Sequence, residues 1–203
     1  MNNHPHAKKI WDFLLSKIGN AYGVAALMGN LQSESGLYPD RLQGDIPYSS
    51  KSQEYTAKVD SGEISKNDFI YNGPGGGGYG LAQWTFWQRK KWLYEMYESG
   101  NYDSIGSLSL ALDYLWWELQ NSYPGVLSVL KTASNIRTPS DKVLHDFENP
   151  EIQDTSVEVL RASQGENIYK TFFGSEPGTE PGEPGNRTNK KLPFLLLAMA
   201  ADE

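Results

Sequence analysis

The first 31 residues constrain the fold more than any other part of the chain, because two helical patterns follow each other with almost no connection between them. Each pattern places apolar residues at i, i+3, i+4 and i+7: first Trp11, Leu14, Leu15 and Ile18, then Val24, Leu27, Met28 and Leu31. This spacing predicts two helices with one apolar face each. Gly19 and Asn20 end the first helix. Small residues in the second allow close packing against its neighbours: Gly23, Ala25, Ala26 and Gly29.

Further helical patterns cover most of the chain from about residue 85 to residue 173. They predict helices over about 85–96, over 107–120 with Ser107 as N-cap, over 124–130 beginning at Pro124, from an N-cap at Ser140 through Phe147, and over 155–173. The segment 36–78 lacks strong periodicity and is rich in Gly, Pro and Ser, so it is predicted to be mostly irregular. The expected fold class is mainly α, with at most a small β-hairpin in that segment.

The composition changes at Ser175, where three Glu-Pro-Gly units follow within ten residues. Proline keeps such units extended and the charges keep them solvated, which is typical of a linker. We therefore expect a compact domain over 1–174, a linker over 175–191 and a short apolar tail of unknown role over 192–203. The apolar run of the tail is about half as long as a membrane-spanning helix, so its contact with a membrane stays open.

Charge and composition exclude several classes of function. A net charge of -7 disfavours a nucleic-acid binder, which needs a basic face to displace counterions from phosphates. The chain has no cysteine, and its three histidines form no HExxH pattern, so neither a metal site nor another cofactor is expected. The N-terminal apolar run is interrupted by Asp12 and is too short for a signal peptide. Aromatic residues make up 12% of the chain, which suits either a core or a sugar-binding cleft.

Glu34 is the most informative ionisable residue. A rotation of about 100° per residue places it only about 20° from Leu27 around the axis of the second helix, on the continuation of the buried face. Burial raises the pKa of a carboxyl group, and a proton held near neutral pH is what a general acid needs to protonate a glycosidic oxygen. The alternatives are a solvated residue at a frayed helix end, or a carboxylate paired with a nearby arginine.

A second distinctive stretch is the glycine-rich sequence from residue 73 to residue 84, GPGGGGYGLAQW. Glycines allow close approaches that side chains would block, so a polymer could lie against this main chain. A phosphate-binding loop is disfavoured, because the GxxxxGK[ST] lysine is missing. An ordinary flexible surface loop remains the alternative.

Taken together, three motifs resemble the phage tail-tip lysozyme family of the lysozyme superfamily, which is related to goose-type lysozymes and lytic transglycosylases. A G-N-x-x-x-E-S-G motif at a helix end is matched by Gly29, Asn30, Glu34, Ser35 and Gly36. A Y-G-L-A-Q-W motif after a glycine-rich loop is matched by Tyr79 to Trp84, and an F-E-x-P element by Phe147, Glu148 and Pro150. Their order and separation fit over roughly residues 8 to 174, which implies a lysozyme-like α+β domain.

The resemblance implies cleavage of the β-1,4 bond between N-acetylmuramic acid and N-acetylglucosamine in peptidoglycan. Glu34 would be the general acid. Six further residues would contact the substrate or the cleft around it: Asn30, Ser35, Tyr79, Gln83, Trp84 and Glu148. Ser35 and Gln83 would form hydrogen bonds there, while Tyr79 and Trp84 would line saccharide subsites. Glu148 would either anchor the helix junction, pair with Arg89 or Arg161, or act as a second carboxylate.

The mechanism depends on that second carboxylate. Retaining glycosidases place it about 5 to 5.5 Å from the acid and inverting ones about 6.5 to 9.5 Å. The irregular segment offers Asp40, Asp45, Asp60 and Asp68, which the sequence does not rank. Family members also work with one dominant glutamate, and some release 1,6-anhydro sugars through attack from within the substrate.

We therefore expect a muramidase that opens the cell wall locally from a phage tail. The alternatives are a lytic transglycosylase, a non-catalytic glycan-binding tail-tip module, and a lysin encoded by a Gram-positive host. The expected partners are peptidoglycan strands and other phage tail proteins, with no nucleic acid. The expected location is the virion tail or the extracellular cell wall.

Overall fold

The computed structural model describes residues 3–72 and 77–174. It is mainly helical, as the sequence predicts. The predicted linker over 175–191, the tail over 192–203 and the first residues of the glycine-rich stretch lie outside the described residues.

Two N-terminal helices form the centre of the domain. Helix α1 covers Ala7–Ile18 and ends at Gly19, which adopts a left-handed conformation. Helix α2 covers Ala21–Ser35 and begins at Asn20, whose side chain accepts a hydrogen bond from the Gly23 amide. Because α2 is buried almost all round from Gly23 to Leu31, it is the central helix of this half of the molecule.

The C-terminal helices pack around α2. They are α7 at Pro124–Lys131, α8 at Arg137–Lys142, the π-helical turn η2 at Val143–Glu148, and α9 at Thr155–Phe172. A Cβ atom added to Gly29 of α2 would lie 2.5 Å from the Arg161 carbonyl oxygen of α9, so only glycine permits this helix crossing. The predicted close packing of the small residues is confirmed here. The predicted N-cap at Ser140 is wrong, because the helix begins three residues earlier and Ser140 is buried inside it.

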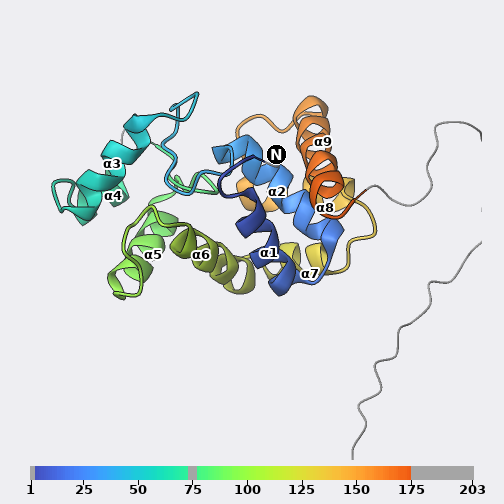
Figure 1. Cartoon of the computed structure of the whole chain (residues 1–203), viewed down its shortest axis with the longest axis horizontal. Coiled ribbons are helices and arrows are strands. Elements are labelled where there is room, and N and C mark those ends of the chain that lie inside the picture. Colours follow the sequence, from blue (N-terminus) through green and yellow to red (C-terminus); the bar gives the residue numbers. More distant parts are fainter. Residues whose placement is uncertain (1–2, 73–76, 175–203) are drawn as a thin grey trace, which may run out of the picture.

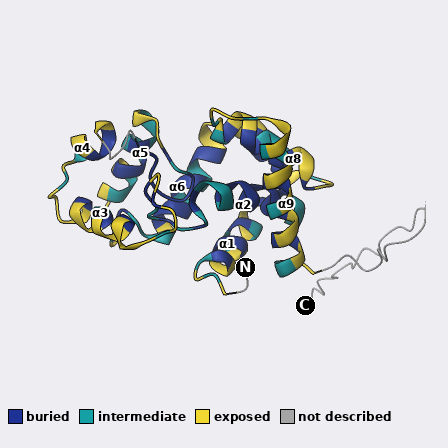
Figure 2. Ribbon diagram, turned by 90° about the horizontal axis from the view of Figure 1, so that it is seen from above, coloured by how far each residue is buried: buried dark blue, intermediate teal, exposed yellow. Residues whose placement is uncertain are grey.

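Among the described residues, four further helices complete the fold: α3 at Ser50–Asp60, α4 at Lys66–Tyr71, α5 at Trp87–Glu98 and α6 at Leu108–Asn121. Figure 1 shows α3, α4 and α5 at one end of the molecule and α2, α8 and α9 at the other, with α6 between them. Buried residues line the inner faces of both groups (Figure 2).

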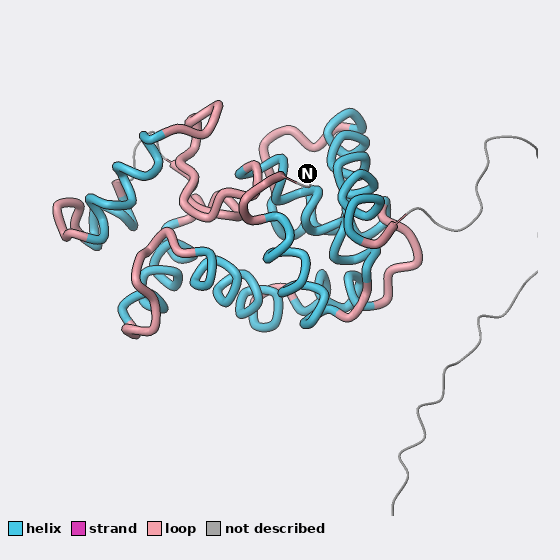
Figure 3. Tube along the Cα trace, viewed as in Figure 1, coloured by secondary structure: helices cyan, strands magenta, loops and turns pink. Residues whose placement is uncertain are grey.

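The prediction that residues 36–78 are mostly irregular is wrong for α3 and α4, which the trace in Figure 3 shows as helices. The buried positions of α3 are Ser52, Thr56 and Val59, so a helical spacing exists but is largely polar. A search for apolar periodicity passes over such a helix. In place of a hairpin, the described residues here form only isolated β-bridges, from Tyr79 to Leu42 and from Tyr79 to Trp84.

Candidate active site

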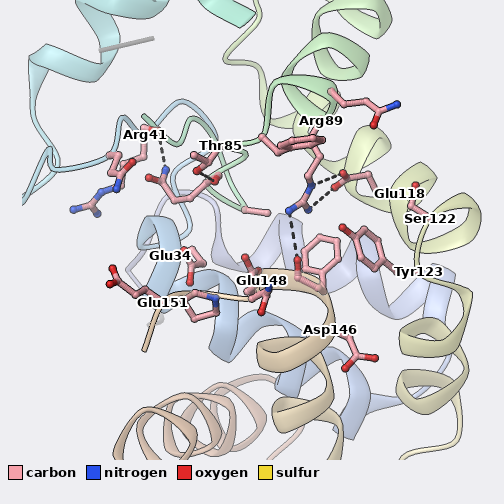
Figure 4. A pocket seen from close by; sticks show the side chains of 18 of the residues that line it. Glu34, Arg41, Thr85, Arg89, Glu118, Ser122, Tyr123, Asp146, Glu148 and Glu151 are labelled. Atoms are coloured by element: carbon pink, nitrogen blue, oxygen red, sulfur yellow. Dashed lines mark hydrogen bonds and ion pairs between the residues drawn. The ribbon is translucent and has the colours of Figure 1, made fainter. Parts of the chain in front are cut away.

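A cleft of about 910 Å³ lies between the two groups of helices. One wall comes from the end of α2 and from residues 146–151, and the other from residues 41–46 and 82–92. Five acidic side chains and two arginines line it: Glu34, Glu118, Asp146, Glu148, Glu151, Arg41 and Arg89 (Figure 4). An acidic cleft that is open to solvent suits a neutral or cationic ligand better than a phosphate polymer.

Glu34 lies in the last turn of α2, two residues before the left-handed Gly36 that caps the helix. Its side chain is 18% exposed and forms an ion pair with Arg161 of α9, whose side chain is 7% exposed. The structure therefore brings Glu34 to the cleft wall, as predicted. It also realises the alternative in which this carboxylate pairs with an arginine.

Asn30 supports this ion pair from one turn below. Its Oδ1 accepts a hydrogen bond from Arg161 Nη1 at 3.3 Å, and its Nδ2 donates to Ser140 Oγ at 3.1 Å. Asn30 is fully buried, so it does not contact the cleft. This corrects its prediction as a substrate-binding residue: it orients Arg161, which in turn holds Glu34.

Ser35 is also buried and serves the end of the helix. Its Oγ donates a hydrogen bond to the Leu31 carbonyl at 3.1 Å and accepts one from the Leu37 amide at 3.1 Å. The second bond satisfies the main-chain amide of Leu37, which lies just beyond the helix end. The predicted contact of Ser35 with a sugar is therefore corrected to a structural role.

Gln83 does line the cleft, at the tight turn between Tyr79 and Trp84. Its backbone is left-handed with φ 45°, and its Nε2 donates hydrogen bonds to the carbonyls of Arg41 at 2.9 Å and of Gly80 at 3.0 Å. These bonds fix the amide plane at the wall opposite α2.

Tyr79 and Trp84 are core residues, with 2% and 0% of their surface exposed. The Tyr79 hydroxyl pairs with Thr56 Oγ1 at 2.8 Å, and Trp84 Nε1 donates to Glu118 at 2.6 Å. Neither ring offers a face to the cleft, which corrects the prediction that they line saccharide subsites. Composition cannot separate core rings from ligand-binding rings, because both kinds are large and apolar.

Phe86 is the most exposed of the aromatic residues that line the cleft, at 56%. Trp87 follows it at 42% exposure, with the two ring centres 5.7 Å apart, and stacks on Tyr71 at 5.9 Å. Phe86 was not among the site residues predicted from the sequence. Its place two residues after the Y-G-L-A-Q-W motif was the available signal.

Glu118 is a carboxylate of the cleft that was not predicted from the sequence. It is fully buried in α6 and receives four hydrogen bonds, two from Arg89 at 2.7 and 2.9 Å, one from Trp84 and one from Tyr114. All its acceptor capacity faces donors, so it stabilises the wall. Arg89 also lies 4.7 Å from the Phe147 ring centre and so ties α5 to η2.

Glu148 ends η2 and lines the cleft near Glu34, as Figure 4 shows. Its Oε1 is buried and has no hydrogen-bond partner. Burial, and next the negative charge of Glu34, raise the pKa of the Glu148 carboxyl well above its usual value, against the opposing effect of Arg89 and Arg161.

None of the aspartates considered as a second carboxylate lines the cleft. Asp45 is buried, and hydrogen bonds from Ser49 and Ser52 lower its pKa to about 2. Asp60 accepts hydrogen bonds from Ser104 and the Ile105 amide. These carboxylates stabilise turns on the α3 side of the molecule.

The geometry brings together an acidic cleft, a glutamate at a helix end, and a second carboxyl from the F-E-x-P element. A family model described as phage tail lysozyme matches residues 5–172 of the chain. The chain belongs to the phage tail lysozyme family. No match was found among curated proteins or among solved structures.

Membership in the phage tail lysozyme family confirms the resemblance seen in the three motifs. It indicates a lysozyme-like enzyme whose substrate is peptidoglycan, and it indicates association with the virion tail. Within the described residues, no helix is both long and apolar enough to cross a membrane.

Proposed function

We propose that this phage tail lysozyme cleaves the β-1,4 bond between N-acetylmuramic acid and N-acetylglucosamine, with Glu34 as general acid. The observation that carries the proposal is the position of Glu34 at a helix end on the wall of an open cleft, held there by Arg161. A fixed carboxyl is the group that a glycosidase needs beside the scissile oxygen. Acting from the virion tail, such an enzyme would open the wall locally, and other tail proteins would be its neighbours.

Gln83 and Phe86 are the proposed substrate contacts on the opposite wall. The Gln83 amide has a fixed plane and lies opposite the acid, so it suits the N-acetyl group or a hydroxyl of the sugar. The exposed Phe86 ring offers an apolar surface on which a sugar face can pack.

Lytic transglycosylation is the second candidate. The described part of the cleft contains none of the four aspartates of residues 40–68 that were candidates for a water-holding carboxylate. In transglycosylation the 6-hydroxyl of the sugar replaces water as the nucleophile, so that carboxylate is not needed.

The test is mass spectrometry of soluble products from purified peptidoglycan. Reducing muropeptides ending in N-acetylmuramic acid identify a muramidase, and products lighter by one water identify a transglycosylase. Reducing ends on N-acetylglucosamine would instead indicate a glucosaminidase. No product from several wall types would refute the enzyme and favour a glycan-binding module.

Two variants assign the acid. Glu34→Gln should abolish the products while the fold is retained. Glu166→Gln, an exposed change on α9, is the matched control and should leave the product yield unchanged. Full activity of Glu34→Gln would refute the assignment of Glu34.

A further inference from the structure

Two carboxyl groups of the cleft are in opposite situations: Glu118 is fully buried, whereas Glu148 is half-buried with one buried oxygen. Glu118 has four donors around it, whereas Glu148 leaves Oε1 buried with no donor. An ionised carboxylate without a donor is strongly disfavoured inside a protein, and such a group takes up a proton instead. Glu148 therefore differs from an ordinary structural glutamate.

The backbone holds Glu148 in this place. The Asn149 amide donates to the Leu144 carbonyl at 2.8 Å, five residues back, and Asn149 is left-handed with φ 48°. A π-helical turn of this kind costs stability and is frequent at functional sites. Here it points the last residue of η2 toward the end of α2.

If Glu148 is ionised, it and the charged groups around it carry one more negative charge than positive charges. The groups facing it are Glu34 of α2, Glu118 of α6, Arg89 of α5 and Arg161 of α9. Arg89 is bound to Glu118, and Arg161 is bound to Glu34. If Glu148 were also ionised, three carboxylates would face two guanidinium groups in a largely buried site.

We propose that Glu34 and Glu148 hold one proton between them in the resting enzyme, and that Glu148 is the positioning residue that keeps this proton available to Glu34. Arg161 forms an ion pair with Glu34, and Glu148, whose Oε1 has no donor, is the neighbouring carboxyl group that can supply a proton to Glu34. Two carboxyl groups that share a proton lose it only at raised pH, because the second ionisation places two like charges together.

The catalytic part of this inference rests on the proposed function. In that reaction, Glu148 gives its proton to the Glu34 carboxylate, and Glu34 gives a proton to the glycosidic oxygen as its bond to the anomeric carbon breaks. The attacking water, or the 6-hydroxyl in transglycosylation, releases a proton as it bonds to that carbon. This proton returns to the pair, which ends the cycle with one proton again.

The first test does not depend on activity. Glu148→Gln keeps the shape of a protonated glutamate, so its melting temperature should equal that of the parent at about pH 3, where Glu148 is protonated in both folded and unfolded chains. Since the folded state raises the pKa of Glu148, the parent loses stability as pH rises from there toward that pKa. The melting temperature of the variant, relative to that of the parent, should rise by at least about 2 °C between pH 4 and pH 8.

Glu166→Gln serves as the control and should follow the parent across this range, because its side chain is exposed. If Glu148 were instead an ionised partner of the arginines, Glu148→Gln would lose stability relative to the parent as pH rises. That result, or a difference that does not change with pH, would overturn the shared proton.

The second test is the pH profile of product release. In Glu148→Gln, Glu34 keeps Arg161 but loses the carboxyl group that would supply its proton, so the alkaline limb of the activity profile should move down by about one pH unit or more. Glu148→Asp retains a carboxyl group, so its alkaline limb should lie closer to that of the parent than the limb of Glu148→Gln does. A purely structural role would lower activity by one factor at every pH and leave the limb in place, which would overturn the positioning role. If the parent releases no product, the proposed function fails, and the melting series still decides whether the proton is shared.

Discussion

Gly29→Ala tests how closely the site depends on the crossing of α2 and α9. The added Cβ would lie 2.5 Å from the Arg161 carbonyl oxygen and 2.6 Å from the Gly165 amide nitrogen, against about 3.4 Å for an ordinary contact. The helices must therefore separate by about 0.9 Å, and no side-chain rotation can relieve the contact, because both neighbours are main-chain atoms.

The expected cost follows from that displacement. Overpacking lowers the free energy of unfolding by about 1–3 kcal/mol, here at the upper end of that range. The better helix propensity of alanine offsets about 1 kcal/mol of this loss. We expect the free energy of unfolding to fall by about 2 kcal/mol. Because Arg161 moves with α9, Glu34 loses its position, and a displacement of this size lowers the rate of product release by up to about 100-fold.

Chemical denaturation and initial rates of product release measure the two effects. Gly125→Ala is the control, because Gly125 lies in the helix α7 with no atom within 4 Å of the added Cβ. It should be neutral or more stable by about 0.5 kcal/mol. If Gly29→Ala is as stable and as active as the parent, the close crossing does not position the site.

Two aromatic changes separate a ligand-binding ring from a core ring. Phe86→Ala should raise the KM for soluble glycan fragments by roughly 5-fold, about 1 kcal/mol, with the free energy of unfolding changed by no more than about 0.5 kcal/mol. The control is Leu160→Ala on α9, where the side chain is 55% exposed, and it should leave the KM unaltered. An unchanged KM for Phe86→Ala would argue against sugar packing on this ring. Trp84→Phe should lower the free energy of unfolding by about 2–3 kcal/mol, since Glu118 loses a donor in the core; a raised KM at full stability would instead show that the Trp84 ring contacts sugar.

The sequence predicted best those helices whose buried faces are apolar. The helices α1, α2 and α6 follow from the spacing of their apolar side chains. The beginnings of α6 and α7 follow from Ser107 and Pro124, which act within one or two turns. Helix α3 was missed because two of its three buried positions carry hydroxyl groups, so its periodicity was not apolar. The N-cap at Ser140 failed because that hydroxyl bonds to Asn30 on another helix.

The same distinction holds for the site. The position of Glu34 could be predicted, because its angle around the α2 axis is a local property of the chain. The burial of Trp84 and Asn30 could not, since the residues that cover or bind them come from other helices.

The sequence by itself determined a mainly helical fold and a glutamate at the end of its central helix. Membership in the phage tail lysozyme family was also encoded there, in three short motifs. Only the tertiary structure decided which groups surround that glutamate. Arg161 stands 127 positions away along the chain, and Glu148 reaches the cleft through a π-helical turn. The protonation of a carboxyl depends on every charge and every missing donor within a few ångströms, and chain folding alone determines which residues these are.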